Sequence, residues 1–244
     1  MTTSRWDRRG PGEAGRRLLA VLGAVAVFSV TVGAFTLLRR PAETGTAATT
    51  GSYDAPVSTV WRAADGSVAV AGGGVRWPLL EIYTDYRCAT CAEMEDVTGA
   101  TIKRLASQGR VRAVYRPVAF ETAEPAASAT RRAANASLCA PAGHWLAYHG
   151  ALFTRGPMEG AGGFTAADLV ALARDTGIAD PAFGGCVTGG LQSARLDRLT
   201  QEARDARGVH EVPAAFLNGT RLDLQDHLLS PARLERAVHT AVRP

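Results

Sequence analysis

Apolar and polar residues follow two different periodicities between residues 79 and 118. Residues 79–84 form a short apolar run rich in β-formers, which predicts a buried strand. Residues 92–107 place apolar side chains at helical spacing, and Gly109 follows as a stop signal. Residues 111–118 alternate and predict a second strand. The order strand, helix, strand predicts a βαβ unit with a parallel strand pair.

A second group of elements is expected near the C-terminus. Asn218 and Gly219 are a strong hairpin-turn pair, so residues 214–217 and 220–224 are predicted as two antiparallel strands. A closing helix is expected over residues 230–242, because Ser230 is a good N-cap and Pro231 suits the first helical position.

Residues 125–207 lie between these two groups and are too many for one crossover connection. Glycines and prolines, Gly184-Gly185 among them, divide this stretch into several apolar-periodic segments. We therefore expect helices over residues 125–139, 144–153, 165–176 and 190–207. The predicted fold class is α/β: residues 56–124 and 208–244 form one domain in two parts, and residues 125–207 form an inserted helical domain.

The N-terminal segment predicts a membrane anchor. Residues 18–38 contain no charged side chain, and as a helix they extend about 31 Å, close to the roughly 30 Å of a bilayer core. Five arginines precede this transmembrane helix, so residues 1–17 are expected to be a cytoplasmic basic tail. Residues 39–55 are expected to be a flexible linker. A cleavable signal peptide is the alternative, and both interpretations place the remainder of the chain outside the cytoplasm.

The net charge of +4 is concentrated in the N-terminal segment. Residues 1–40 hold seven arginines against two acids, whereas the remainder holds 20 basic and 21 acidic side chains. The basic balance therefore gives no support for nucleic-acid binding.

Four cysteines, Cys88, Cys91, Cys139 and Cys186, follow the predicted anchor. Disulfides persist outside the cytoplasm, so an even number of cysteines favours disulfide chemistry. A four-cysteine zinc site usually takes its ligands as two close pairs, and only Cys88 and Cys91 are close, so no metal is expected. A Cys139–Cys186 bridge would close a long loop, which suits a structural disulfide. A Cys88–Cys91 bridge would close a very short loop and constrain the unfolded chain little, which suits a redox pair.

Cys88 is expected at the start of the predicted helix. Free backbone N–H groups and the helix dipole favour a thiolate there, which makes Cys88 the nucleophile. Cys91, one turn later, is expected to be the buried resolving thiol. Glu93, Glu95 and Asp96 are expected in the first turn, where they would oppose the thiolate if they faced it.

Three features together resemble the DsbA-like branch of the thioredoxin superfamily over residues 56–244. They are the sequence Asp85-Tyr86-Arg87-Cys88-Ala89-Thr90-Cys91 after a strand, the helical insert, and Val212-Pro213-Ala214 before a hairpin. The resemblance implies a thioredoxin fold, and it implies that Pro213 has a cis peptide bond beside the active cysteines. It also assigns Cys88, Cys91 and Pro213 to catalysis, and Val212 and Thr90 to substrate binding.

The chain departs from the family pattern at three positions. Ala89 stands where a proline often follows the first cysteine, and Thr90 stands where strong oxidants carry histidine. Ile82 occupies the position of a buried acid that is a candidate proton acceptor, and Glu81 is expected on the opposite face of the strand. His210 is a weaker candidate near Cys88. These differences leave the direction of the redox reaction open.

The resulting hypothesis is a single-pass extracytoplasmic oxidoreductase of the cell membrane that oxidises thiols of unfolded or reduced secreted proteins. Exchange between two sulfurs requires no cofactor, and none is expected. Reoxidation by a membrane quinone-linked partner would complete the cycle. The alternatives are a reductase or isomerase kept reduced by a membrane donor, and a redox-inert binding module with two structural disulfides.

Overall fold

The computed structural model describes residues 59–156 and 163–241. Its strands are β1 (Thr59–Arg62), β2 (Val68–Ala71), β3 (Leu79–Thr84), β4 (Arg112–Pro117), β5 (Ala214–Leu217) and β6 (Thr220–Arg221). Its helices are α2 (Ala89–Ser107), α3 (Ala126–Cys139), α4 (Ala142–Arg155), α5 (Ala166–Asp175), α6 (Pro181–Thr188), α7 (Ser193–Arg207), the π-helical turn η2 (Leu224–Leu228) and α8 (Pro231–Ala241).

The described strands form one mixed sheet in the order β1-β2-β4-β3-β5-β6. β3 and β4 are parallel, which confirms the βαβ unit predicted from the sequence. β5 is antiparallel to β3, with Ala215 opposite Ile82. The hairpin at Asn218-Gly219 is also confirmed, but its second strand ends at Arg221, because the chain turns into η2 instead of continuing to residue 224.

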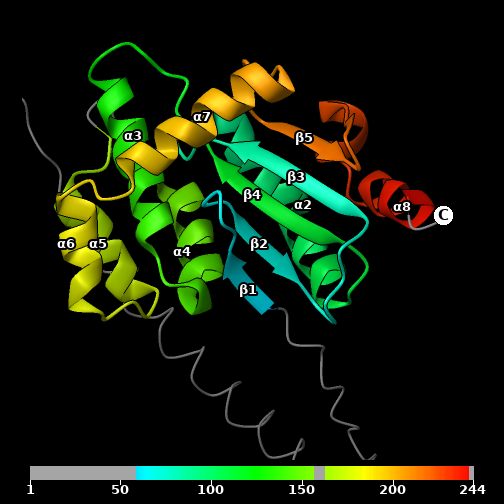
Figure 1. Cartoon of the computed structure of the whole chain (residues 1–244), viewed down its shortest axis with the longest axis horizontal. Helices are drawn as coiled ribbons and strands as arrows, with labels where there is room; N and C mark the ends of the chain where they lie inside the picture. Colours follow the sequence, from blue (N-terminus) through cyan, green and yellow to red (C-terminus); the bar gives the residue numbers. More distant parts are fainter. Residues whose placement is uncertain (1–58, 157–162, 242–244) are drawn as a thin grey trace, which may run out of the picture. The chain divides into compact units, whose positions relative to one another are not determined.

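Helices cover both faces of the sheet (Figure 1). On one face Ile82 joins the hydrophobic core formed with α2, whose contributions include Met94 and Ile102. On the other face the buried carboxylate of Glu81 accepts a 2.7 Å hydrogen bond from Arg207 of α7. Because side chains alternate along β3, Glu81 and Ile82 lie on opposite faces of the sheet, as predicted, and Ile82 is the one on the side of α2.

Within the described residues, helices α3 to α7 fill the connection between β4 and β5 (Figure 1). The prediction of a break at Gly184-Gly185 was wrong, because α6 runs through both glycines. The Asp180 side chain caps its first turn and Pro181 occupies the first helical position, and these strong start signals outweigh the low helix propensity of glycine. The helix predicted over residues 190–207 begins three residues later, at Ser193.

The antiparallel pair β1–β2 extends the sheet beyond β4 and was not predicted as strands. All four residues of β2 are buried, so their apolar side chains give no alternating signal that would distinguish a strand from a buried turn.

The predicted transmembrane helix and linker lie outside the described residues. No helix within residues 59–156 and 163–241 combines the length and the apolar character needed to cross a bilayer.

Candidate functional site

Cys88 occupies the N-cap of α2, directly after the loop that leaves β3. The backbone N–H of Cys88 donates to the Asp85 carbonyl at 3.2 Å, which turns the chain from the strand into the helix. The Cys88 Sγ accepts a hydrogen bond from the backbone N–H of Cys91 at 3.1 Å. The Cys88 sulfur therefore caps the helix as a side-chain oxygen usually does, by accepting from a backbone N–H group of the first turn that has no partner within the helix.

The acidic residues of α2 are placed differently from the prediction. The helix begins at Ala89, one turn earlier than the apolar periodicity indicated, so its first turn contains no acid. Glu93 is exposed, and Glu95 is buried, forms an ion pair with Lys103 at 2.5 Å and lies 3.4 Å from His149 Nε2. The acids therefore do not stand in the first turn, where they would oppose a Cys88 thiolate if they faced it.

The two sulfurs differ strongly in acidity. The hydrogen bond from the Cys91 thiol lowers the pKa of Cys88, and the backbone N–H groups of Cys91 and Thr90 act in the same direction. Burial and the Asp85 carboxylate partly oppose this effect. Cys91 is 0% exposed, and its burial raises its pKa far above the ordinary value. In the dithiol form, Cys88 is thus the sulfur that ionises first.

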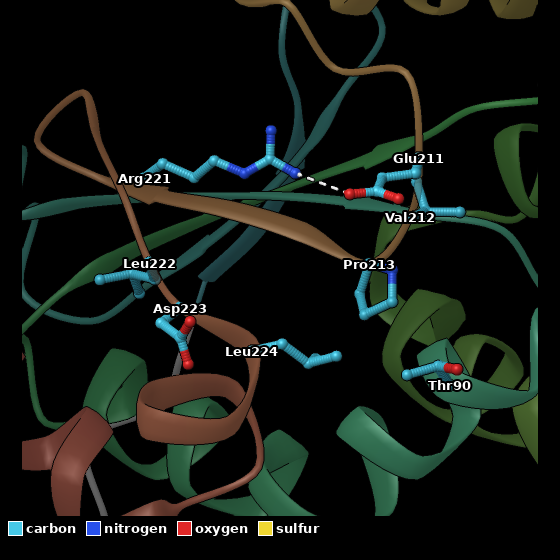
Figure 2. A pocket seen from close by; sticks show the side chains of 8 residues that line it. All are labelled: Thr90, Glu211, Val212, Pro213, Arg221, Leu222, Asp223 and Leu224. Atoms are coloured by element: carbon cyan, nitrogen blue, oxygen red, sulfur yellow. Dashed lines mark ion pairs between the residues drawn. The ribbon is translucent and has the colours of Figure 1, made fainter.

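The segment before β5 faces this cysteine pair. The Val212–Pro213 peptide bond is cis, and the Cys88 thiol donates to the Val212 carbonyl oxygen over 3.5 Å. On one side of the segment is a pocket of about 610 Å³ (Figure 2). Thr90 and Pro213 line it, and Arg221 approaches Glu211 to 3.8 Å across its rim. The structure therefore brings together the predicted residues Cys88, Cys91, Thr90, Val212 and Pro213.

A second pocket, of about 460 Å³, is lined by Cys88 and by residues of the same segment before β5. Its lining includes Asp85, His210 and Phe120. His210, the weaker candidate near Cys88, is exposed. It lines the same pocket as Cys88. Asp85 belongs to the motif quoted from the sequence, but no sequence signal assigned its carboxylate to this pocket.

Cys139 and Cys186 form a disulfide that joins the end of α3 to α6. Cys88 and Cys91 are free thiols in this structure. The Cys139–Cys186 pairing leaves too few cysteines for a four-cysteine zinc site.

A buried polar cluster, formed by Tyr86, Glu95, Ser137 and His149, lies beneath the site. The Tyr86 hydroxyl is 2.6 Å from Ser137 Oγ and 2.9 Å from His149 Nδ1, and His149 continues to Glu95. The cluster connects the active-site loop to α2, α3 and α4. Sequence reasoning missed it, because its members are far apart in the chain and only their packing reveals a relation.

Gly156, the C-cap of α4, contacts the active-site loop. A Cβ added there would collide with the carbonyl oxygen of Tyr86, two residues before Cys88. We expect Gly156→Ala to displace this loop, to cost about 1–3 kcal/mol of unfolding free energy and to slow alkylation of Cys88. Chemical denaturation and the alkylation rate measure the two effects. Gly185→Ala is the matched control, because a Cβ there meets nothing within 4 Å. Equal effects of both substitutions would contradict this account.

Comparison with known proteins supports the architecture. A family model described as thioredoxin matches residues 78–239, which is more than half of the chain. No curated protein sequence matches the chain.

Three solved structures illustrate the similarity in fold. The reduced disulfide bond oxidoreductase DsbG from Mycobacterium tuberculosis is 24% identical, with a TM-score of 0.60 over 77% of this chain and 88% of that chain. The thiol-disulfide oxidoreductase MdbA from Actinomyces oris is 24% identical, with a TM-score of 0.61 over 72% and 88%. Oxidised BdbD from Bacillus subtilis is 16% identical, with a TM-score of 0.60 over 76% and 97%. The predicted DsbA-like resemblance is confirmed in fold, and from the family match the chain belongs to the thioredoxin family.

Proposed function

We propose that this protein is a thiol-disulfide oxidoreductase that oxidises cysteine pairs of unfolded or reduced secreted proteins. One observation carries the proposal: an accessible, readily ionised Cys88 at a helix N-terminus lies against the Val212-Pro213 segment, while its partner Cys91 is buried and hard to ionise. This asymmetry suits a disulfide that opens preferentially at one sulfur. MdbA and DsbG, whose folds are similar, are themselves described as oxidoreductases.

The proposed reaction consists of two exchanges. A substrate thiolate attacks Cys88 of the Cys88–Cys91 disulfide, so a substrate–Cys88 bond forms and Cys91 leaves and takes up a proton. A second substrate thiolate then attacks the substrate sulfur of this mixed disulfide. The substrate gains one disulfide, Cys88 leaves as a thiolate, and two electrons remain on the reduced pair.

The groups around Cys88 favour these two exchange steps. The helix N-terminus stabilises the leaving Cys88 thiolate through the Cys91 N–H group. The backbone at Val212 and Pro213, with Thr90 across the 610 Å³ pocket, would hold an extended substrate segment against Cys88. Reoxidation of the pair requires an external acceptor, for which we propose a membrane quinone-linked partner.

We also propose that residues 18–38 anchor the chain in the cell membrane, with the N-terminus in the cytoplasm and the described domain outside. The positive residues before the apolar segment support this orientation. The Cys139–Cys186 disulfide supports an extracytoplasmic location, because such bonds persist in oxidising compartments.

Oxidation of a reduced, unfolded protein by the full chain tests the proposed activity. The disulfide form should form substrate disulfides stoichiometrically, and catalytically when an oxidant is supplied. Cys88→Ser should fold normally, as judged by its unfolding free energy, and lose this activity by at least about a hundredfold, because no exchangeable disulfide remains at the helix start. Retained activity in Cys88→Ser, or none in the native chain, would refute the proposal. Efficient reduction of disulfides without oxidation of thiols would favour the reductase alternative.

A further inference from the structure

Asp85 is a buried acid that the exchange reaction described above does not use. It directly follows β3, is only 8% exposed, and lines the 460 Å³ pocket together with Cys88. Its carbonyl accepts the Cys88 N–H, so the acid and the reactive cysteine are joined by one tight turn. Asp85 Oδ1 accepts bonds from the Arg87 N–H at 2.8 Å and from the Thr130 hydroxyl at 3.5 Å. These bonds fix the carboxylate at the edge of the site.

Charged, titratable and hydroxyl groups from several segments line the pocket together with Asp85. Arg87 and Cys88 belong to its own loop, Glu121 follows β4, Thr130 is on α3, and His210 and Glu211 precede β5. Glu121, His210 and Glu211 are exposed, so water and salt screen their charges. Asp85 is the buried carboxylate among the groups that line this pocket, so its charge acts on Cys88 through the least-screened medium.

Two negative charges at this turn oppose one another. The Asp85 carboxylate raises the pKa of Cys88 against the lowering effect of the helix N-terminus. Burial in turn raises the pKa of Asp85, although the bonds from Arg87 and Thr130 partly offset this. The Asp85 carboxylate therefore disfavours ionisation of Cys88.

We propose that Asp85 is a positioning residue that limits thiolate formation at Cys88 and thereby sets how strongly the Cys88–Cys91 disulfide oxidises its substrates. The reduced pair is stabilised when Cys88 is a thiolate, and a disulfide whose reduced form is stable is a strong oxidant. The Asp85 carboxylate destabilises that reduced form. The native pair is therefore a weaker oxidant than its helix N-terminus alone would produce.

This inference rests on the proposed redox function, but its test does not require turnover. The full chain is reduced, and the rate at which iodoacetamide alkylates Cys88 is followed as a function of pH by mass spectrometry of the Cys88 peptide. The equilibrium of the Cys88–Cys91 pair with glutathione is measured on the same samples. Asp85→Asn removes the charge but keeps an oxygen that accepts the Arg87 and Thr130 bonds. Glu121→Gln removes an exposed charge from the same pocket and is the matched control.

In Asp85→Asn we expect the apparent pKa of Cys88 to fall by about one unit. The equilibrium constant with glutathione should shift up to about tenfold towards the reduced pair, equivalent to about 30 mV. Glu121→Gln should give less than a third of either shift. An unchanged or raised pKa in Asp85→Asn, or an equal shift in Glu121→Gln, would overturn the proposal.

A folding control keeps the result interpretable. Unfolding free energies of the variants show whether the turn survives, and Asp85→Ser, which also accepts the Arg87 N–H bond without a charge, replaces Asp85→Asn if that variant does not fold. If the native chain fails to oxidise substrate while Asp85→Asn still lowers the Cys88 pKa, the proposed function fails and the role of Asp85 stands. If the native chain oxidises substrate but Asp85→Asn leaves the pKa of Cys88 unchanged, the proposed function stands and the role of Asp85 fails.

Discussion

Replacing Cys91 by serine is expected to convert the protein into a trap for its substrate. In this variant the Cys88 thiolate attacks a disulfide of an oxidised test protein, one substrate sulfur bonds to Cys88, and the other leaves as a thiolate. In the native chain Cys91 would then attack Cys88 and release the substrate. The serine hydroxyl is a far weaker nucleophile, so the mixed disulfide should accumulate at least about tenfold over its level in the native chain.

Non-reducing electrophoresis quantifies the adduct, and mass spectrometry locates the attached cysteine. Cys88→Ser is the matched control, because it retains one thiol of the pair. That thiol, Cys91, is 0% exposed and has a strongly raised pKa, so this variant should form almost no adduct. Comparable adducts in the two variants would contradict the distinct roles proposed for the two sulfurs.

His149→Phe is expected to cost about 3 kcal/mol or more of unfolding free energy. His149 is 1% exposed, stacks on Trp145, and lies 3.4 Å from Glu95. Phenylalanine retains the aromatic packing but leaves the buried Glu95 carboxylate with Lys103 as its remaining ion-pair partner. Removing one member of a buried pair typically costs about 3–5 kcal/mol, because the charge left behind is poorly compensated.

The pH dependence of the same variant gives a second test. Burial disfavours the charged form of Glu95, but His149 and Lys103 hold its pKa at about 2. This is below the value of about 4.3 in an unfolded chain, so the pairing stabilises the protein above about pH 4 and the contribution disappears as the pH falls towards 2. The difference in unfolding free energy between the native chain and His149→Phe should therefore shrink over that interval.

Glu93→Gln is the control, because Glu93 is an exposed acid on the same helix. Denaturant unfolding should show a change within about 0.5 kcal/mol for this variant at neutral pH. A destabilisation by His149→Phe no larger than that of Glu93→Gln would show that the buried cluster does not stabilise the domain.

The reactive pair was predictable because its chemistry is local in the sequence. Cys88 and Cys91 follow a strand and start a helix, and those three signals are consecutive within residues 79–107. Pro213 was recognised only through the family resemblance, since Cys88 and Val212 are 124 positions apart and nothing between them in the sequence indicates that they meet. The parallel β3–β4 pair was predicted for the same reason as the cysteines: its three elements are consecutive.

The missed features depend on packing between distant segments. Glu95 was predicted as a first-turn acid because apolar periodicity begins after Cys91, whereas the helix itself starts at its cysteine cap. The buried Glu95 lies 3.4 Å from His149, which is 54 positions later, and no spacing rule connects them. The carboxylate of Asp85 acquires its role from α3 and from the loop before β5, which together enclose the pocket. Such relations exist only in the folded chain.

The apparent pKa of Cys88 in the native, reduced full chain tests the central claim most directly. The rate of Cys88 alkylation as a function of pH gives this value. Mass spectrometry of the Cys88 peptide distinguishes alkylation of Cys88 from alkylation of the other cysteines. We predict a pKa below the roughly 8.5 of a free cysteine, because hydrogen bonds from the Cys91 thiol and from the N–H groups at the N-terminus of α2 stabilise the thiolate. A value at or above that of free cysteine would contradict the assignment of Cys88 as the exchanging sulfur.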